Sequence, residues 1–562
     1  MTASLLFPPA LLLIGGGLLL PLLRGWLRQA TILVVPLLTL YAVWQTPDGI
    51  GLTAPFLGYE LTLVKGDALS RLFAIVFAVM AFAGGLFALN QERVTELAAA
   101  FCYAGGAIGV VFAGDLLTVF IFWEAMAIAS TLVIWSGGSS AARAAGLRYA
   151  AIHLLGGVLL MAGIAGEVLR TGSPAFGPMA LDSLPRWLML AGFLINAAAP
   201  PLSAWLPDAY VESSWSGMVF LSAFTTKTAV YVLMRGFPGA ELLIWLGLFM
   251  VFYGIVYAIL ENDMRRILAY SIVNQVGFMV AGIGIGTEMA LNGTAAHAFT
   301  HIIYKALLLM SAGSVLFMTG KRKCTDLGGL FRTMPLTTLC GIVGALSISA
   351  FPLTSGFVSK SMISEAAGIA HLETVWYLLA AASAGVFLHA GVKFPWFVFF
   401  QKDSGLRPPD PPWNMRAAML FFAALCIGLG VMPGPLYALL PFPVRFEPYT
   451  GSHVVFQLQL LLFSGLAFFL MLGWLQRTLT LTLDVDWFYR RAGMVLARWL
   501  DRSVASVWSL CASLTAGGMR HCVSWIQRYH GGNGVLARTW STGLMVFWAT
   551  LMLGAWLVLS YW

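Results

Sequence analysis

Three titratable residues, His297, His301 and Lys305, follow one another at intervals of four within a strongly apolar segment. Residues at that interval lie on one face of an α-helix, so the three side chains form a single stripe. Titratable groups in a row inside a membrane make a candidate proton relay. Two alternatives are an H-x-x-x-H metal site, for which the segment supplies no further ligands, and histidines that only pack.

Two more charged residues lie inside apolar segments. Glu124 lies in DLLTVFIFWEAMAI, and Lys227 lies in SAFTTKTAVYVLM. A charge in the hydrocarbon region is costly unless it is paired or neutralised, so such residues are functional candidates by default. A lysine whose charge depends on the position of its partner could take up and release a proton. The alternative for each residue is a fixed structural ion pair.

A later segment repeats the spacing with His389 and Lys393, which could end the relay. Lys393 could instead extend its ammonium group toward the membrane surface. Asp208 follows a proline-rich interruption and is interpreted as a cap or loop residue. His153 and Glu167 share one segment, and both are interpreted as structural.

The composition is that of a membrane protein. Of 562 residues, 59% are hydrophobic and only 10% are charged, whereas soluble domains carry about 25% charged residues. The net charge of +8 is spread over loops and a C-terminal stretch, which favours a membrane surface and not nucleic acid as the partner. No C-x-x-C pair and no glycine-rich nucleotide loop is found, so we expect no cofactor and no oxidoreductase activity from this chain alone.

Apolar runs long enough to cross a membrane recur along the whole chain. The first lacks a basic start and is predicted to be a spanning helix, not a cleaved signal peptide. The pattern predicts an all-α integral membrane protein with about 14–16 transmembrane helices, with candidates at 5–22, 29–45, 69–89, 96–113, 115–135, 146–169, 187–206, 216–235, 240–260, 267–286, 293–318, 335–355, 374–400, 415–433, 453–476 and 540–560.

Two of these runs are interrupted, by APPLS at 199–203 and by AFPLTSG at 350–356. Irregular backbone at membrane depth is tolerated where it lines protein or a water-filled cavity, and paired breaks indicate two related halves. We therefore predict N-terminal helices (1–95), two five-helix repeats (96–238 and 239–402), C-terminal spans (403–476), an amphipathic helix (477–538) and a final transmembrane helix (539–562).

The segment 477–538 combines arginines with an apolar face, which predicts an amphipathic helix along the cytoplasmic surface or against neighbouring helices. Gly517-Gly518 is expected to break it. The loops between spans alternate between the two sides of the membrane, and the loops of one side hold about twice as many Lys and Arg residues as those of the other side. Lys360 is placed in a loop of the side with fewer basic residues. The richer side is predicted to be cytoplasmic, so the N-terminus would face outward.

Six strings, in order, resemble the antiporter-like subunits of respiratory complex I and the large subunits of Mrp-type cation/proton antiporters and membrane-bound hydrogenases (the proton-conducting transporter superfamily, to which the D-type antiporter subunits belong). Inorganic-carbon accumulating complexes have related subunits. The resemblance covers about residues 60–430. The strings are FWEAMAIAS, PPLSAWLPDAY, KTAVYVLMR, RRILAYSIVNQVG, HAFTHIIYKALLLMSAGSV and FPLTSGFVSK.

The resemblance implies two inverted five-helix repeats, each with a broken helix, around a central polar axis. It matches Glu124 to the essential glutamate of the family. It places five residues at the buried lysine and histidine positions, namely Lys227, His297, His301, Lys305 and Lys393. Asn196 stands where many members carry a lysine, so the usual Glu–Lys partnership would run from Glu124 to Lys227.

The leading hypothesis is a proton-translocating or cation/proton-translocating subunit of a multisubunit complex in the cell's inner (plasma) membrane. Its expected partners are other membrane subunits, the lipid bilayer and protons, with Na⁺ as an option. The complex could be NADH dehydrogenase-like or hydrogenase-like. One alternative is a membrane subunit of an inorganic-carbon uptake complex. A further alternative is a scaffold that has lost transport, which only Asn196 supports.

Overall fold

The computed structural model describes residues 7–56, 58–475, 477–479 and 483–562. Within these residues, thirteen helices are long and apolar enough to cross a membrane, and two shorter apolar helices accompany them. The predicted all-α membrane fold is therefore confirmed. Residues 5–6 of the first predicted helix and 480–482 of the predicted amphipathic segment lie outside the described residues.

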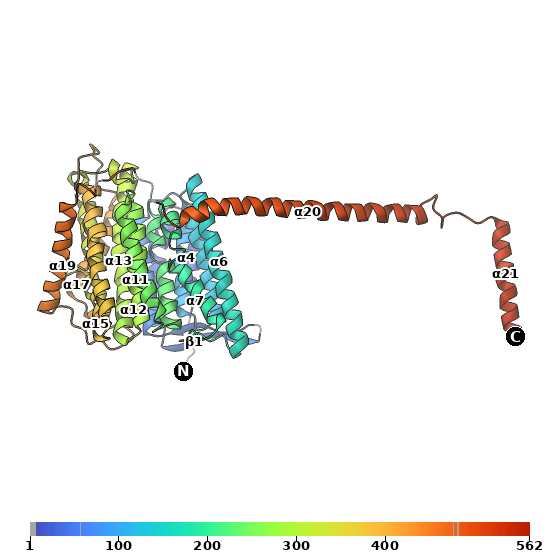
Figure 1. Ribbon diagram of the computed structural model, residues 1–562, viewed down its shortest axis with the longest axis horizontal. Helices are drawn as coiled ribbons and strands as arrows, with labels where there is room; N and C mark the ends of the chain where they lie inside the picture. Colours follow the sequence, from blue (N-terminus) through green and yellow to red (C-terminus); the bar gives the residue numbers. More distant parts are fainter. Residues whose placement is uncertain (1–6, 57, 476, 480–482) are drawn as a thin grey trace. The chain divides into compact units, whose positions relative to one another are not determined.

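The first compact unit reaches from the N-terminus to Asp486. Its helices stand side by side in Figure 1. The N-terminal part contains α1 (Pro9–Leu19), η1 (Leu20–Leu22), α2 (Gly25–Gln45), α3 (Ala68–Phe87), α4 (Val94–Phe112), α5 (Leu116–Trp135), α6 (Ser140–Thr171), α7 (Leu184–Asn196), α8 (Trp205–Ala209), η2 (Tyr210–Glu212), α9 (Gly217–Leu221) and α10 (Thr225–Gly236).

The same unit continues with α11 (Leu242–Leu260), α12 (Met264–Ile285), α13 (Glu288–Thr319), η3 (Cys324–Asp326), η4 (Leu330–Arg332), α14 (Pro335–Ile348), α15 (Ser355–Ile369), α16 (Glu373–Val386), two π-helical turns η5 (Phe387–Lys393) and η6 (Trp396–Phe400), α17 (Trp413–Val431), α18 (Gly434–Tyr437) and α19 (Gly451–Leu470). Side-chain caps set several helix starts, since Asp115 accepts a hydrogen bond from Thr118 N and Thr287 from Ala290 N.

An antiparallel hairpin, β1 (Gly49–Phe56) and β2 (Tyr59–Gly66), lies between α2 and α3 and was not predicted. Polar and apolar residues do not alternate regularly along these strands. The sequence therefore lacks the two-residue period from which a strand is predicted. The hairpin is joined to the helices because Thr62 N donates to Asp115 Oδ2 at 2.8 Å.

Both predicted interruptions are confirmed as breaks in helices. The first separates α7 from α8, where Ala198 has a φ of 59°. The second separates α14 from α15, where Ala350 and Leu353 have φ values of 56° and 69°. Left-handed backbone at these alanine and leucine residues is strained, and it persists because the surrounding helices hold it. The first break lies in the fourth span when spans are counted from α4. The second break lies in the fourth span when they are counted from α11.

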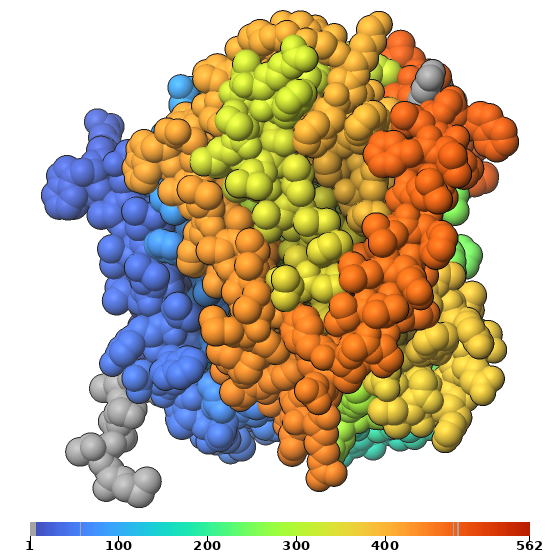
Figure 2. Space-filling model, turned by 90° about the vertical axis from the view of Figure 1, so that its left-hand side faces the viewer, coloured from blue at the N-terminus to red at the C-terminus, as the bar shows by residue number. Residues whose placement is uncertain are grey.

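The long helix α13 forms the centre of this unit and packs against α3, α9, α10, α12, α14, α15 and α17. Figure 2 shows α17, in orange, beside the blue N-terminal helices, and α19, in dark orange, on the other side of the face turned toward the viewer. Segments far apart in the sequence, such as α3 and α17, are thus in contact. The side chains of α13 are enclosed over most of its length.

The second unit, Trp487–Trp562, contains nearly all of the helix α20 (Asp486–His530) and the final helix α21 (Thr542–Tyr561). The expected break at Gly517-Gly518 is wrong, because α20 runs through both glycines for 45 residues. Glycine in a helix costs about 1 kcal/mol relative to alanine, which the turns on either side outweigh. Neither glycine has a positive φ.

Candidate functional site

Glu124 lies on α5 with its carboxyl group against α6. A Cβ atom on Gly157 of α6 would overlap Oε1 of Glu124, so the glycine leaves the space that the carboxyl group fills. Oε1 is buried and has no hydrogen-bond partner among the described residues. Ile121 and Ile128 on the same helix are 55% and 65% exposed, so Glu124 lies near the outer edge of this unit.

Lys227 is the third residue of α10 and is fully buried. Its ammonium group donates to the carbonyl oxygen of Ser222 at 2.7 Å and to Thr226 Oγ1 at 3.1 Å. Within the described part of the chain no carboxylate lies within ion-pair distance of it. The partnership expected between Glu124 and Lys227 is therefore not a direct contact in this structure.

The stripe predicted on one helix is present on α13, where His297, His301 and Lys305 are all fully buried. The His297 ring lies 3.2 Å from Ser359 Oγ and 3.1 Å from Gln275 Oε1. Lys305 donates to Ser271 Oγ.

His301 occupies the middle of the stripe, and both of its ring nitrogens lack a partner in the described residues. Lys227, Lys305 and His297 all lie within electrostatic range of this ring. The two lysines and two histidines thus form one buried group of bases drawn from α10 and α13.

The prediction that Lys360 lies in a loop is wrong. It lies on α15, shortly after the second break, and is only 2% exposed. Its ammonium group is 4.3 Å from the centre of the Phe278 ring and has no hydrogen-bond partner among the residues described. The string FPLTSGFVSK contained this lysine, and its apolar neighbours Phe357, Val358, Met362 and Ile363 were the available signal for burial.

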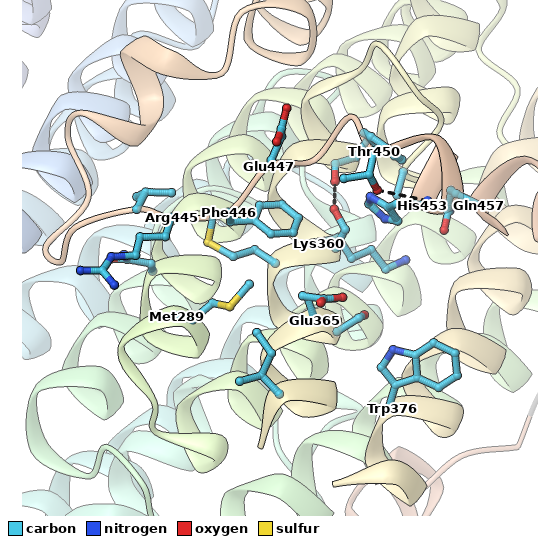
Figure 3. A pocket seen from close by; sticks show the side chains of 18 of the residues that line it. Met289, Lys360, Glu365, Trp376, Arg445, Phe446, Glu447, Thr450, His453 and Gln457 are labelled. Atoms are coloured by element: carbon cyan, nitrogen blue, oxygen red, sulfur yellow. Dashed lines mark hydrogen bonds between the residues drawn. The ribbon is translucent and has the colours of Figure 1, made fainter. Parts of the chain in front are cut away.

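Lys360 is one of the residues that line a cavity of about 1000 Å³ between the start of α13, α15, α16 and the segment leading to α19. Figure 3 shows its side chain extending into the space near Glu365, Trp376 and Gln457. The wall also contains Arg445. Ser359, the residue before Lys360 on α15, contacts His297, so adjacent residues of α15 touch the cavity and the α13 stripe.

His389 and Lys393 are both buried in the π-helical turn η5. His389 Nδ1 lies 2.8 Å from the carbonyl of Gly385. Lys393 donates at 2.7 Å to three carbonyl oxygens at the end of α11, those of Ala258, Ile259 and Glu261. A cation at that position satisfies carbonyls that the helix leaves unpaired, so Lys393 caps α11 and does not extend to the surface.

Asn196 is the last residue of α7, directly before the first break, and it is buried. Its Oδ1 has no hydrogen-bond partner in the described residues. Asp208 lies after the break on α8 and receives two hydrogen bonds from Arg148, at 2.7 and 2.8 Å. Glu167 pairs with Arg170 and Arg186 near the end of α6.

The Arg148–Asp208 contact predicts a loss of stability in Asp208→Asn. Removing the carboxylate leaves the guanidinium of Arg148 without this partner, which we expect to cost about 2 kcal/mol. The thermal unfolding midpoint of the assembled protein in detergent would fall. The matched control is Asp182→Asn, because Asp182 is 54% exposed beside Arg186. Equal midpoints for the two variants would contradict the prediction.

The comparisons with known proteins agree with the resemblance noted in the sequence. A model of the family described as NADH:quinone oxidoreductase/Mrp antiporter, transmembrane, matches residues 113–388. The chain is 30% identical over 337 residues to the D-type subunit of the Na⁺/H⁺ antiporter of Alkalihalophilus pseudofirmus, covering 56% of this chain and 67% of that protein. It is 31% identical over 372 residues to the N-type subunit of the NADH-quinone oxidoreductase of Desulforudis audaxviator, covering 62% and 70%.

The fold is also found in a solved structure. A chain of the membrane-bound sulfane sulfur reductase, an archaeal respiratory membrane complex, superposes with a TM-score of 0.71 at 24% identity, covering 98% of this chain and 99% of that chain. Coverage of the curated relatives is smaller, since the chain spans only 41% of a probable K⁺/H⁺ antiporter protein of Rhizobium meliloti. By its sequence identity to these D-type and N-type proteins, this multi-span membrane protein belongs to the NADH:quinone oxidoreductase/Mrp antiporter family of membrane subunits.

Proposed function

We propose that this protein translocates protons, or exchanges cations for protons, as one membrane subunit of a multisubunit complex. The observation that carries the proposal is the buried group of bases on α10 and α13, which has no ion-pair partner among the described residues. Fixed charges of this kind would destabilise the fold in a membrane without a compensating function. Bases that exchange one proton among them supply that function.

The proposed path begins at Glu124, passes Lys227, and continues along Lys305, His301 and His297 to Lys360. A proton on Lys227 places a positive charge within range of the His301 ring. Occupancy at one site therefore changes the affinity for a proton at the next, which couples the sites. Lys393 and His389 lie at the border of this path, where Lys393 holds the end of α11.

The cavity at Lys360 supplies one exit to water. Arg265 and Arg266 in the first turn of α12, together with Lys321–Lys323 after α13, would face the cytoplasm by the distribution of positive charge. The cavity lies at the start of α13, which is the opposite end of that helix. It would then open to the outside, on the same side as the N-terminus.

The edge position of Glu124 favours a partner for this residue in a neighbouring subunit. One carboxyl oxygen is enclosed by α6, while the helix face around it exposes large apolar residues. A lysine of the neighbouring chain could reach the carboxyl group there. The relatives are named as subunits of Na⁺/H⁺ antiporters and of NADH-quinone oxidoreductase. Proton movement would therefore be coupled either to Na⁺ exchange or to a redox reaction elsewhere in the complex.

The proposal is tested with Lys227→Ala in vesicles that carry the whole native complex. We expect dissipation of an imposed pH gradient, read with a pH-sensitive dye, to slow by about 100-fold, the usual scale for loss of a positioned acid–base group. Lys402→Ala, at an exposed loop residue, is the matched control. Unchanged proton movement in Lys227→Ala would support the alternative that the chain is a scaffold.

A further inference from the structure

A second buried polar group lies beside the first break and is separate from the α13 stripe. It contains the side-chain hydroxyls of Tyr103, Ser130, Tyr149, Tyr210 and Thr225, here called the hydroxyl cluster. These five residues come from α4, α5, α6, η2 and α10, and none is more than 1% exposed. Such a concentration of hydroxyl groups from five elements is not required for packing, because phenylalanine or valine would fill the same space.

Hydrogen bonds join part of the cluster. The hydroxyls of Tyr103 and Thr225 lie 2.5 Å apart, and those of Ser130 and Tyr149 lie 2.8 Å apart. The Tyr149 and Tyr210 rings are 6.3 Å apart between centres, with the Trp205 ring against both. The hydroxyl of Tyr210 interacts with Tyr103 and Thr225, although neither contact has the hydrogen-bond geometry of the other two pairs.

One end of the cluster, Thr225, lies two residues before Lys227 on α10. Thr225 and Thr226 directly precede this lysine on α10, and Thr226 Oγ1 accepts a hydrogen bond from its ammonium group at 3.1 Å. Thr225 in turn contacts Tyr103. The cluster therefore begins within two residues of a proposed relay base.

The other end reaches toward Glu124 through His153. The His153 ring stacks on Tyr149 with centres 3.9 Å apart, and its Nδ1 lies 3.0 Å from the Tyr149 carbonyl. Its Nε2 is buried without a partner in the described residues. His153 lies one helical turn before Gly157 on the same face of α6, and Gly157 is the residue that the Glu124 carboxyl group contacts.

We propose that the hydroxyl cluster, with His153, carries protons between Lys227 and Glu124 in place of the lysine that Asn196 replaces. This inference rests on the proposed function. An amide does not change charge by taking up a proton near neutral pH, whereas a hydroxyl accepts one proton while it donates another. Sequence alone favoured a structural role for His153, and the free Nε2 beside the cluster is the observation that changes this interpretation.

The transfer is balanced at every atom. In one direction, the ammonium group of Lys227 gives a proton to the nearest hydroxyl oxygen as that hydroxyl passes its own proton to the next. Each oxygen forms one O–H bond, breaks one and ends neutral. His153 accepts the last proton on Nε2 and delivers it to the carboxylate of Glu124. Buried polar atoms without partners among the described residues, such as Nε2 of His153, are costly in a static core and useful in such a chain.

Tyr210→Phe is the sharpest test, because it removes one hydroxyl of the cluster and keeps the ring that packs against Trp205. In vesicles with the whole complex, we expect proton movement to fall by about tenfold, equivalent to about 1.4 kcal/mol in the barrier, while thermal stability stays unchanged. The matched control is Tyr231→Phe, since Tyr231 is a buried phenol that donates to the carbonyl of Val111 outside the cluster. That control should lose stability and keep its proton movement.

A second variant tests directly whether the cluster acts in place of a lysine at position 196. Adding Asn196→Lys to Tyr210→Phe should restore at least half of the proton movement, because a lysine at the break offers a parallel path. Tyr149→Phe serves as an independent loss-of-hydroxyl variant with the same expected decrease. Glu124→Gln is measured in the same assay, so that the two proposals fail separately.

The outcomes are distinct. If Glu124→Gln blocks proton movement while Tyr210→Phe and Tyr149→Phe behave like Tyr231→Phe, the hydroxyl cluster is not part of the path and the inference is overturned, although the proposed function stands. If Glu124→Gln also leaves proton movement unchanged, the proposed function fails and the inference fails with it. A decrease in both cluster variants with rescue by Asn196→Lys supports the inference.

Discussion

Glu124→Gln will stop proton movement through the complex while its subunits remain assembled. Glutamine keeps the shape of the side chain, and the space next to Gly157 still accepts it. Glutamine cannot bind and release a proton, so proton transfer through this position stops. We expect a decrease of at least about 100-fold, the scale of a lost acid–base group. The measurement is dissipation of a pH gradient in vesicles with the native complex, with assembly followed by native gel electrophoresis.

The matched control for this prediction is Glu167→Gln. Glu167 is another carboxylate on α6, but it is held by Arg170 and Arg186 near the helix end. Its replacement should lower stability and leave the rate of proton movement per assembled complex unchanged. If Glu124→Gln moves protons at the wild-type rate, either protons pass through another chain of the complex or this chain is mainly a scaffold. Asn196, at a position where the resemblance places a lysine, would then be the main support for a scaffold role.

Lys360→Met should have an effect of similar size. Methionine fills the same space between the cavity and the α13 stripe but binds no proton, so the connection from His297 to the cavity is lost. We expect proton movement to fall by about 100-fold. Arg445→Gln is the control, because Arg445 lies in the wall of the same cavity with its side chain exposed. It should change the rate by less than about twofold, as surface charges act weakly.

The side on which the cavity opens gives this prediction a second measurement. Glu447→Cys, at an exposed residue of the cavity wall and in a background without the exposed Cys511 and Cys522, should react with a membrane-impermeant thiol reagent added from outside the cell. Labelling from the cytoplasmic side alone would contradict the proposed orientation. Normal proton movement in Lys360→Met would remove Lys360 from the path.

The α13 stripe was predictable from sequence because it depends on one helix only. The spacing of His297, His301 and Lys305 determines that they share a face whatever surrounds them. The two breaks were equally visible, since proline removes a backbone donor and cannot continue a helix. The family was recognisable for the same reason, because its strings are local.

Contacts between distant residues were not predictable in this way. Lys360 and Lys393 look alike as lysines near the ends of apolar runs, yet one lines a cavity and the other binds three carbonyls. The Glu261 carbonyl that Lys393 caps is 132 residues away in the chain. The continuity of α20 through Gly517-Gly518 was missed because two glycines weaken a helix without forcing it to end.

The sequence by itself determined the membrane-spanning helices, their two interruptions and the stripe of bases on α13, because hydropathy, helical period and proline act over a few residues. Only the tertiary structure decided which charges have partners. It placed Glu124 against Gly157, left His301 without a partner among the described residues, and gathered the hydroxyl cluster from five elements. Those arrangements depend on how helices pack, and packing joins residues whose separation in sequence carries no signal of their contact.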